Sequence, residues 1–251
     1  KGDVIAKVGG TYDAAPDELV VGVYGDYEYK VTAKDAETVY AGRVEQEIAD
    51  ITIEEEVAKT FIANRSVILT LPSWAKWGAL PVEVKGDDFT LELSQFYGRE
   101  GNEARYTVRG SGNKDPDELK FEDMEIVLSP EAPVGEDVVV AFSGSAGVRG
   151  NPVVATVAAP ATIDVDEIKV IGIGRSNQDI GEIIITEAKA GLFKDSKDIQ
   201  LMLDEYVKWA SASVEVEEGD IALGSVTGFG TTTLSIRVDY ESDEPSTIKI
   251  T

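Results

Sequence analysis

The chain has 251 residues, 43% of them hydrophobic, which is enough for two globular domains that each bury a core. Its 47 acidic and 23 basic residues give a net charge of -24. Such a field repels nucleic acid phosphates and anionic lipid and attracts cations. The chain contains no cysteine and no histidine, which excludes disulfides, thiolate zinc sites, Cys-His dyads and Ser-His-Asp triads.

Membrane and nucleic acid partners are not expected. No apolar run reaches membrane-spanning length, and no signal peptide is recognisable. The chain opens at Lys1 without a methionine, so we expect either a processed mature product or an excised piece.

Apolar and polar residues alternate with period two through most of the chain, which predicts half-buried strands. In chain order these are expected at residues 51–54, 66–71, 82–85, 89–93, 105–109, 124–128, 137–142, 153–157, 183–185, 199–203, 213–216, 233–238 and 247–250. Turn residues such as Gly144-Ser-Ala-Gly147 separate them. Many short strands with closely spaced turns predict an all-β fold of Ig-like β-sandwich modules.

An internal repeat divides the chain. Residues 42–84 align without a gap with residues 174–216 at an offset of 132, with 16 identities in 43 positions. The shared residues include the pairs Gln46 and Gln178, Glu55 and Glu187, and Trp77 and Trp209. A repeat of this length indicates a tandem of one module.

The repeat is out of phase with the chain. The first module is expected at residues 29–162, and the second, at 163–251, ends before the equivalents of strands 137–142 and 153–159. Those strands have likenesses at the N-terminus, where residues 2–10 resemble 136–144 and residues 19–23 resemble 152–156. We therefore expect residues 1–28 to supply donor strands that complete an incomplete second module.

A sandwich without its last strands would expose apolar core and an unpaired sheet edge. Residues 1–28 either fold back onto residues 163–251 of their own chain, as a closed permuted sandwich, or fill the gap in a neighbouring chain. The second choice is head-to-tail strand addition, which propagates into a filament or lattice, and we favour it. The expected polymerisation strand residues are Val4, Ile5, Ala6, Val8, Val20, Val21 and Val23.

Residues 179–193, which read DIGEIIITEAKAGLF, are followed by IQLML at 199–203 and by VKW at 207–209. This stretch resembles the tandem β-modules of secreted bacterial S-layer and cell-surface proteins, which often accompany copper-amine-oxidase-N-like domains. The resemblance covers residues 170–216 well and 40–84 more loosely. It implies an extracellular or cell-surface scaffold, and it carries no catalytic residues to transfer.

Acidic residues at the junction of the modules are candidate calcium ligands. Asp164 and Asp166 alternate on an extended segment and are followed by Glu167, and hard oxygen ligands suit calcium. The alternative is a solvated acidic surface, which would also explain the acids shared by both copies, such as Glu55 and Glu187. No other cofactor is expected.

The sequence also contains aromatic pairs and carboxylate pairs. Trp74 and Trp77, matched by Tyr206 and Trp209, would form either an aromatic platform for surface glycans or part of the core, and we favour the core. Carboxylate pairs are too numerous for any one of them to indicate a glycosidase. We therefore do not expect an enzyme.

The sequence favours a structural subunit of an extracellular filament or surface layer that polymerises with itself by β-strand complementation. The alternative is a monomeric adhesin or carbohydrate-binding module of a larger cell-surface protein.

Overall fold

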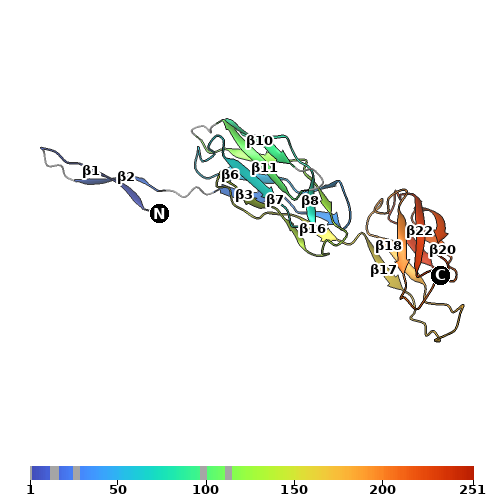
Figure 1. Ribbon diagram of the computed structural model, residues 1–251. Helices are drawn as coiled ribbons and strands as arrows, with labels where there is room; N and C mark the ends of the chain where they lie inside the picture. Colours follow the sequence, from blue (N-terminus) through green and yellow to red (C-terminus); the bar gives the residue numbers. More distant parts are fainter. Residues whose placement is uncertain (1, 12–16, 25–28, 97–100, 111–114) are drawn as a thin grey trace. The chain divides into compact units, whose positions relative to one another are not determined.

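The computed structural model describes residues 2–11, 17–24, 29–96, 101–110 and 115–251 (Figure 1). Every regular element in these ranges is a β-strand, and none of these residues lies in a helix. The described part of the chain accordingly has no helix long and apolar enough to cross a membrane. The prediction of an all-β fold built from sandwich modules is confirmed.

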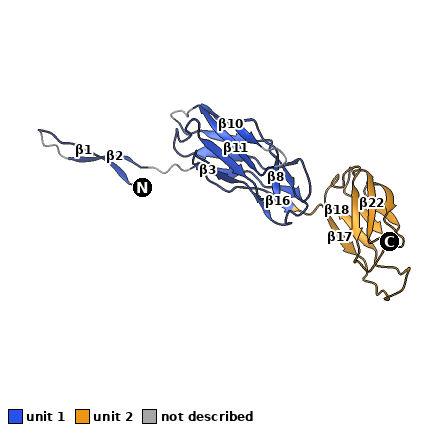
Figure 2. Cartoon of the chain, in the orientation of Figure 1, with its two compact units in different colours: residues 1–157 blue, residues 158–251 orange. Residues whose placement is uncertain are grey.

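The chain forms two compact units, residues 1–157 and 158–251 (Figure 2). The first unit contains an N-terminal hairpin in addition to a sandwich. The predicted donor segment, residues 1–28, is described at 2–11 and 17–24, while its residues 1, 12–16 and 25–28 lie outside the described residues.

The N-terminal hairpin consists of β1 (Asp3–Lys7) and β2 (Glu18–Val23), which pair antiparallel as a two-stranded sheet (Figure 1). Their register shifts at a β-bulge between Val4 and Ile5. Among the described residues, β1 and β2 pair only with each other.

The described residues of the first sandwich form fourteen strands. They are β3 (Tyr29–Ala33), β4 (Glu37–Tyr40), β5 (Gln46–Glu47), β6 (Ile51–Glu55), β7 (Ser66–Thr70), β8 (Ala75–Ala79), β9 (Glu83–Lys85), β10 (Phe89–Phe96), β11 (Glu103–Gly110), β12 (Glu118–Phe121), β13 (Glu125–Leu128), β14 (Asp137–Val139), β15 (Ala141–Ser143) and β16 (Val153–Ala158). The sheets have the strand orders β15-β7-β11-β10-β9, β12-β6-β3, β5-β13-β8 and β14-β16-β4.

Alternate residues of these strands form one core, as period-two patterning requires. Trp77, Tyr106 and Phe121 are fully buried in it, and the rings of Tyr106 and Phe121 meet edge to face at 5.2 Å. Burial raises the pKa of Tyr106, and its hydroxyl donates to the carbonyl of Pro81 at 2.8 Å. The buried polar tip is thus satisfied.

The second unit contains seven strands. They are β17 (Ala161–Val165), β18 (Ile183–Glu187), β19 (Asp198–Met202), β20 (Val214–Glu218), β21 (Ala222–Thr227), β22 (Thr233–Tyr240) and β23 (Thr247–Ile250). They form two sheets, β17-β18-β23-β20 and β19-β22-β21. A smaller core contains Ile185, Trp209, Leu234 and Ile248.

The internal repeat extends to strand registers. β3 pairs with β6 through Val31 opposite Ile53, and β17 pairs with β18 through Ile163 opposite Ile185, each 132 positions later. β7 on β11 and β19 on β22 also share their register, with Leu69 opposite Ala104 and Leu201 opposite Leu234. Other pairings differ; for example, β9 pairs with β10, whereas β20 pairs with β23.

Candidate assembly site

The N-terminal hairpin has the register that the first sandwich uses for β14 and β16. In the sandwich, Asp137 lies opposite Thr156, Val138 opposite Ala155 and Val139 opposite Val153, with a bulge between Val138 and Val139. In the hairpin, Asp3 lies opposite Val23, Val4 opposite Gly22 and Ile5 opposite Val20, with a bulge between Val4 and Ile5. Residues of β1 therefore correspond to residues 134 positions later, and residues of β2 to residues 133 positions later.

Hydrogen bonds beyond the strands follow the same correspondence. In the sandwich, Val157 N donates to Glu136 O at 2.9 Å and Phe142 N donates to Gly150 O at 2.9 Å. In the hairpin, Tyr24 N donates to Gly2 O at 2.8 Å and Val8 N donates to Asp17 O at 2.9 Å. The hairpin thus repeats the β14–β16 pair from Gly2 and Tyr24 at its open end to Val8 and Asp17.

The two pairs differ in burial. The inward side chains of the β14–β16 region, Val138, Val140, Phe142, Val154 and Val157, are at most 4% exposed. Their hairpin counterparts Val4, Ala6, Val8, Val21 and Tyr24 are also apolar. Val8 is 48% exposed, Val21 63% and Tyr24 65%. An isolated two-stranded hairpin is only marginally stable in water, so a partner that covers this face would stabilise it.

The second unit has a strand edge that no other strand covers. In the first sandwich β15 covers one edge of β7, and β11 covers the other. Within residues 158–251, all of them described, β19 pairs with β22 alone. An uncovered strand edge presents unpaired backbone donors and acceptors to another strand.

Another segment of the second unit also lacks the strand partner that its counterpart has in the first sandwich. β4 neighbours β16 in the first sandwich. The residues 132 positions later, 169–172, form no strand. Val39 of β4 is fully buried, whereas its counterpart Ile171 is 41% exposed, and Val170 is completely exposed.

The loop after this segment is nevertheless built in the same way in both units. Gln46 Oε1 accepts from Tyr40 N at 2.6 Å, and Gln46 Nε2 donates to Tyr40 O at 3.0 Å. Gln178 makes the same two bonds to Gly172 at 2.6 and 3.0 Å. This shared glutamine thus fixes the local conformation of the loop before any strand is added.

A buried carboxylate is a structural feature that the sequence analysis missed. Glu187 is 2% exposed and accepts from Leu192 N, Phe193 N, Ser242 Oγ and Ser246 N at 2.5–3.2 Å. Glu55, 5% exposed, likewise accepts at 2.8–3.1 Å from donors that include Phe61 N. The hypothesis that solvated loops explain this pair is wrong, because these carboxylates are buried and hydrogen-bonded. The signal was a glutamate six residues before a phenylalanine in both copies.

The predicted calcium ligands are exposed and do not converge. Asp164 Oδ1 accepts from the next backbone amide, and Asp166 Oδ1 accepts from Glu167 N and Glu182 N, both at 2.6 Å. No three acidic side chains among the described residues gather where they could hold a metal ion. Calcium binding stays a prediction that solution measurements must test.

The three tryptophans belong to the cores. Trp77 is fully buried and Trp209 is 5% exposed, so the predicted core packing is confirmed. Trp74 packs against the core of the first sandwich, and Tyr206 is 89% exposed. Since Trp77 presents no ring face to solvent, it cannot form a sugar platform with Trp74.

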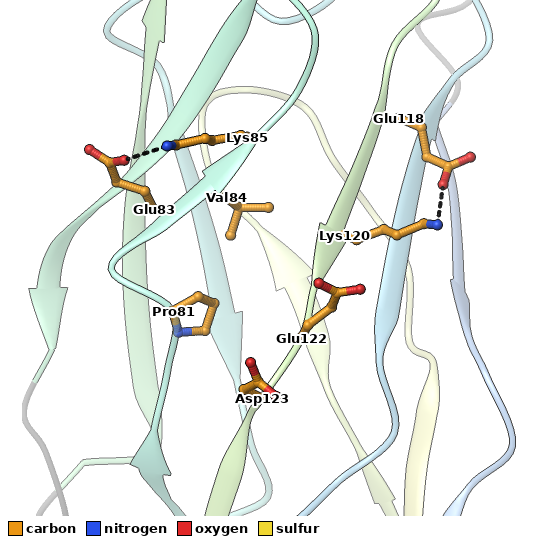
Figure 3. Close-up of a pocket in the computed structure, with 8 residues that line it drawn as sticks. All are labelled: Pro81, Glu83, Val84, Lys85, Glu118, Lys120, Glu122 and Asp123. Carbon is orange, nitrogen blue, oxygen red and sulfur yellow. Dashed lines mark ion pairs between the residues drawn. The ribbon is translucent and has the colours of Figure 1, made fainter.

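A surface hollow of about 480 Å³ lies beside β9 and β12 in the first unit (Figure 3). Its charged residues pair within it, with Lys85 3.7 Å from Glu83 and Lys120 3.3 Å from Glu118. None of the eight residues that line the hollow is aromatic. The hollow therefore offers neither a ring for stacking nor an unpaired lysine for an anion.

No family model and no curated protein matches the chain. Similar solved structures include the major pilin subunit BcpA of Bacillus cereus, at 13% identity and a TM-score of 0.34 over 89% of this chain and 67% of that chain. Another is a C-terminal fragment of the major pilin GBS80 of Streptococcus agalactiae, at 11% identity and a TM-score of 0.38 over 90% of this chain and 79% of that chain. A variant of BcpA matches at 13% identity and a TM-score of 0.34, and the match covers 72% of this chain and 62% of that chain.

These TM-scores are too low to carry a functional inference. The fold itself defines a tandem β-sandwich protein with a hairpin at one end of the sequence and an uncovered sheet edge in the other unit.

Proposed function

We propose that the chain is a non-enzymatic structural subunit that polymerises head to tail into an extracellular filament or surface layer. The hairpin of one copy completes the second unit of the next. One observation carries the proposal: the hairpin repeats the β14–β16 pair residue by residue, bulge included, while its apolar face is exposed.

Strand addition supplies both terms that such a joint needs. Main-chain hydrogen bonds form along an uncovered edge, and alternate side chains enter the core. Because donor and acceptor are different surfaces of one chain, the contact is heterologous and leaves a free donor and a free acceptor after every addition. A contact of this kind propagates unless it closes into a ring.

The test is self-association of the purified chain, followed by sedimentation velocity and negative-stain electron microscopy. Full-length chains should form concentration-dependent linear polymers, and chains without residues 1–10 should stay monomeric. An excess of a synthetic peptide of residues 1–28, added before assembly, should shorten the polymers. A full-length chain that stays monomeric at every concentration and salt would instead support the monomeric adhesin or binding module.

A further inference from the structure

We infer that the acceptor for the hairpin is β19 together with residues 168–174 of a second copy, and that docking places Val8 opposite Leu201. We call this surface the acceptor edge. The inference deepens the proposed function and rests on it, because it names the surface and the register of the joint.

The register follows from the first sandwich. There β15 pairs with β7 through Ala141 opposite Thr70, Phe142 opposite Leu69 and Ser143 opposite Ile68. The first strand of the hairpin corresponds to residues 134 positions later, and β19 corresponds to β7 at the offset of 132. The equivalent pairs in the joint are therefore Lys7 with Met202, Val8 with Leu201 and Gly9 with Gln200. The incoming strand would extend the β19-β22-β21 sheet as β15 extends the sheet of β7.

The acceptor edge lacks the burial that this strand would provide. Leu69 is fully buried beside β15, whereas Leu201 is only half-buried. Ala41 is 8% exposed and its counterpart Ile173 is completely exposed. Apolar side chains at these positions are typical of a surface that is covered in the working assembly.

The second hairpin strand has its own partner in the acceptor edge. β16 lies between β14 and β4 in the first sandwich, so β2 would lie between β1 and residues 169–172. The loop that follows these residues is already held by Gln178. In the inferred joint, residues 169–172 become extended and pair with β2, which converts an irregular segment into a strand.

Gly10 supports the same placement. Its counterpart Gly144 has a φ of 112°, and a Cβ there would lie 2.3 Å from the carbonyl oxygen of Ser66 on β7. Gly10 has a φ of 142°, but a Cβ on it would meet nothing within 4 Å. The docked hairpin would bring Gly10 to the carbonyl of Asp198, the counterpart of Ser66, where a side chain has no room.

The correspondence of side chains ends at Asp17. Gly150, where a Cβ would lie 2.7 Å from Val31, is replaced by Asp17. The proposed contact therefore consists of residues 2–10 and 18–24.

A second copy fits as the occupant better than the same chain. Tyr24 and Tyr29 are five residues apart, which spans at most about 18 Å, so the hairpin stays close to the start of β3. The chain leaves the first sandwich through β16, which ends at the opposite end of that sandwich from the start of β3 (Figure 1). Only a short connection, from Ala158 to Ala161, then leads into β17. Docking onto the same chain would require both short connections to bend around the first sandwich.

Disulfide trapping tests the register, since the chain has no native cysteine. Lys7→Cys chains are mixed with Met202→Cys chains under mild oxidation, and the cross-linked peptides are identified by mass spectrometry. Opposed residues of antiparallel strands have Cα atoms about 4.5–5.5 Å apart, within disulfide reach. The matched control replaces Met202→Cys with Gln200→Cys, two positions along the same exposed face of β19 and beyond reach. We expect at least a tenfold higher yield of the first pair.

The possible outcomes distinguish failure of the inferred acceptor edge from failure of the proposed function. Equal yields for the two pairs, or no cross-link in chains that still polymerise, would overturn the acceptor edge and leave the proposed function standing. A cross-link that forms within the double variant Lys7→Cys/Met202→Cys, but not between mixed single variants, would assign the hairpin to its own chain and overturn the second copy. Chains that neither cross-link nor associate in sedimentation would overturn the proposed function itself.

Hydrogen exchange gives an independent readout. Amides of residues 169–172 and of β19 should exchange at least tenfold more slowly in the polymer than in chains lacking residues 1–10. Protection of β19 without protection of residues 169–172 would show that this segment does not become a strand.

Discussion

Replacing Val21 by aspartate should abolish head-to-tail association, and the same change at Val23 should leave most of it. Both residues lie on β2 and are strongly exposed in the hairpin, at 63% and 68%. Their counterparts differ, because Val154 is fully buried and Thr156 is exposed. The two variants therefore carry the same chemical change and differ in whether docking buries it.

The magnitude follows from this burial. Full burial of a valine side chain contributes about 1.5–3 kcal/mol, so the exposed part of Val21 contributes about 1–2 kcal/mol on docking. Aspartate loses this contribution and must also bury an unpaired carboxylate or take up a proton, which costs several kcal/mol more. A loss of at least about 3 kcal/mol weakens association at least about 100-fold. At Val23 the new carboxylate stays in water opposite Asp3, where cross-strand repulsion costs about 0.2–1 kcal/mol, or at most about fivefold.

Sedimentation velocity of the two variants across a concentration series gives the association constants. Circular dichroism and thermal melts of dilute monomers serve as the control for folding, and both variants should match the unmodified chain there. Equal loss of association in the two variants would refute the assignment of an inward and an outward face. Normal association of the Val21→Asp variant would refute docking of this strand altogether.

Four further predictions concern stability and assembly. Glu187→Gln should lower the free energy of unfolding by about 2–4 kcal/mol, because charge-assisted bonds are lost and an amide faces backbone donors, whereas the exposed Glu215→Gln should change it by under about 0.5 kcal/mol in denaturant titrations. Added NaCl should strengthen polymerisation by screening the charge of -24. Calcium should raise the melting temperature above that measured in NaCl of equal ionic strength; an identical melting temperature with excess EDTA would show that calcium does not bind. Lys249→Met should lower the melting temperature, because the ammonium group of Lys249 pairs with Glu182. The hydrogen bond to Glu182 raises the pKa of Lys249 above 10.5. The stabilisation by Lys249 is lost as pH rises through this raised pKa, so the difference between the two proteins should shrink above pH 10.5.

The sequence predicted strands best where burial imposes a strict period of two. Each predicted segment from residues 51–54 to 247–250 overlaps a strand, although residues 137–142 span two strands and several other segments run one residue past a strand end. β8, which contains Trp77, was missed because Ala75, Gly78 and Ala79 give it little apolar contrast. A strand of small residues has no strong local signal, and its pairing with β13 decides its conformation.

Residues 169–172 show why some strands could not be predicted from the sequence. Lys169-Val-Ile-Gly172 is as apolar as Glu37-Thr-Val-Tyr40 of β4, yet only β4 is a strand, because β16 lies beside it. Strand formation here depends on a partner from elsewhere in the sequence.

The likeness of residues 2–10 to 136–144 was visible in the sequence, but the faces of the hairpin were not. A bulge offsets the alternation of side chains, and the shift at Val4 and Ile5 is defined only by the pairing. The register points Val4 and Val8 inward, whereas the counterpart of Ile5 is half-buried and that of Val23 is exposed. The polymerisation residues predicted from the sequence therefore divide into two faces with different expected effects.

The lengths of two connections explain why the ends of the chain do not coincide with the ends of the repeated module. Val157, near the end of β16, is followed four residues later by Ala161, where β17 begins. Tyr24, the counterpart of Val157, is followed five residues later by Tyr29, where β3 begins. If the hairpin docks in the inferred register, the first sandwich of each copy follows the completed second unit of its neighbour through nearly the same connection that joins the two units within one chain. The joint between copies would then reproduce the joint within a copy, except that one backbone link is replaced by strand pairing. A head-to-tail array built in this way repeats a single kind of sandwich-to-sandwich contact along its whole length, and no additional interface is needed to propagate it.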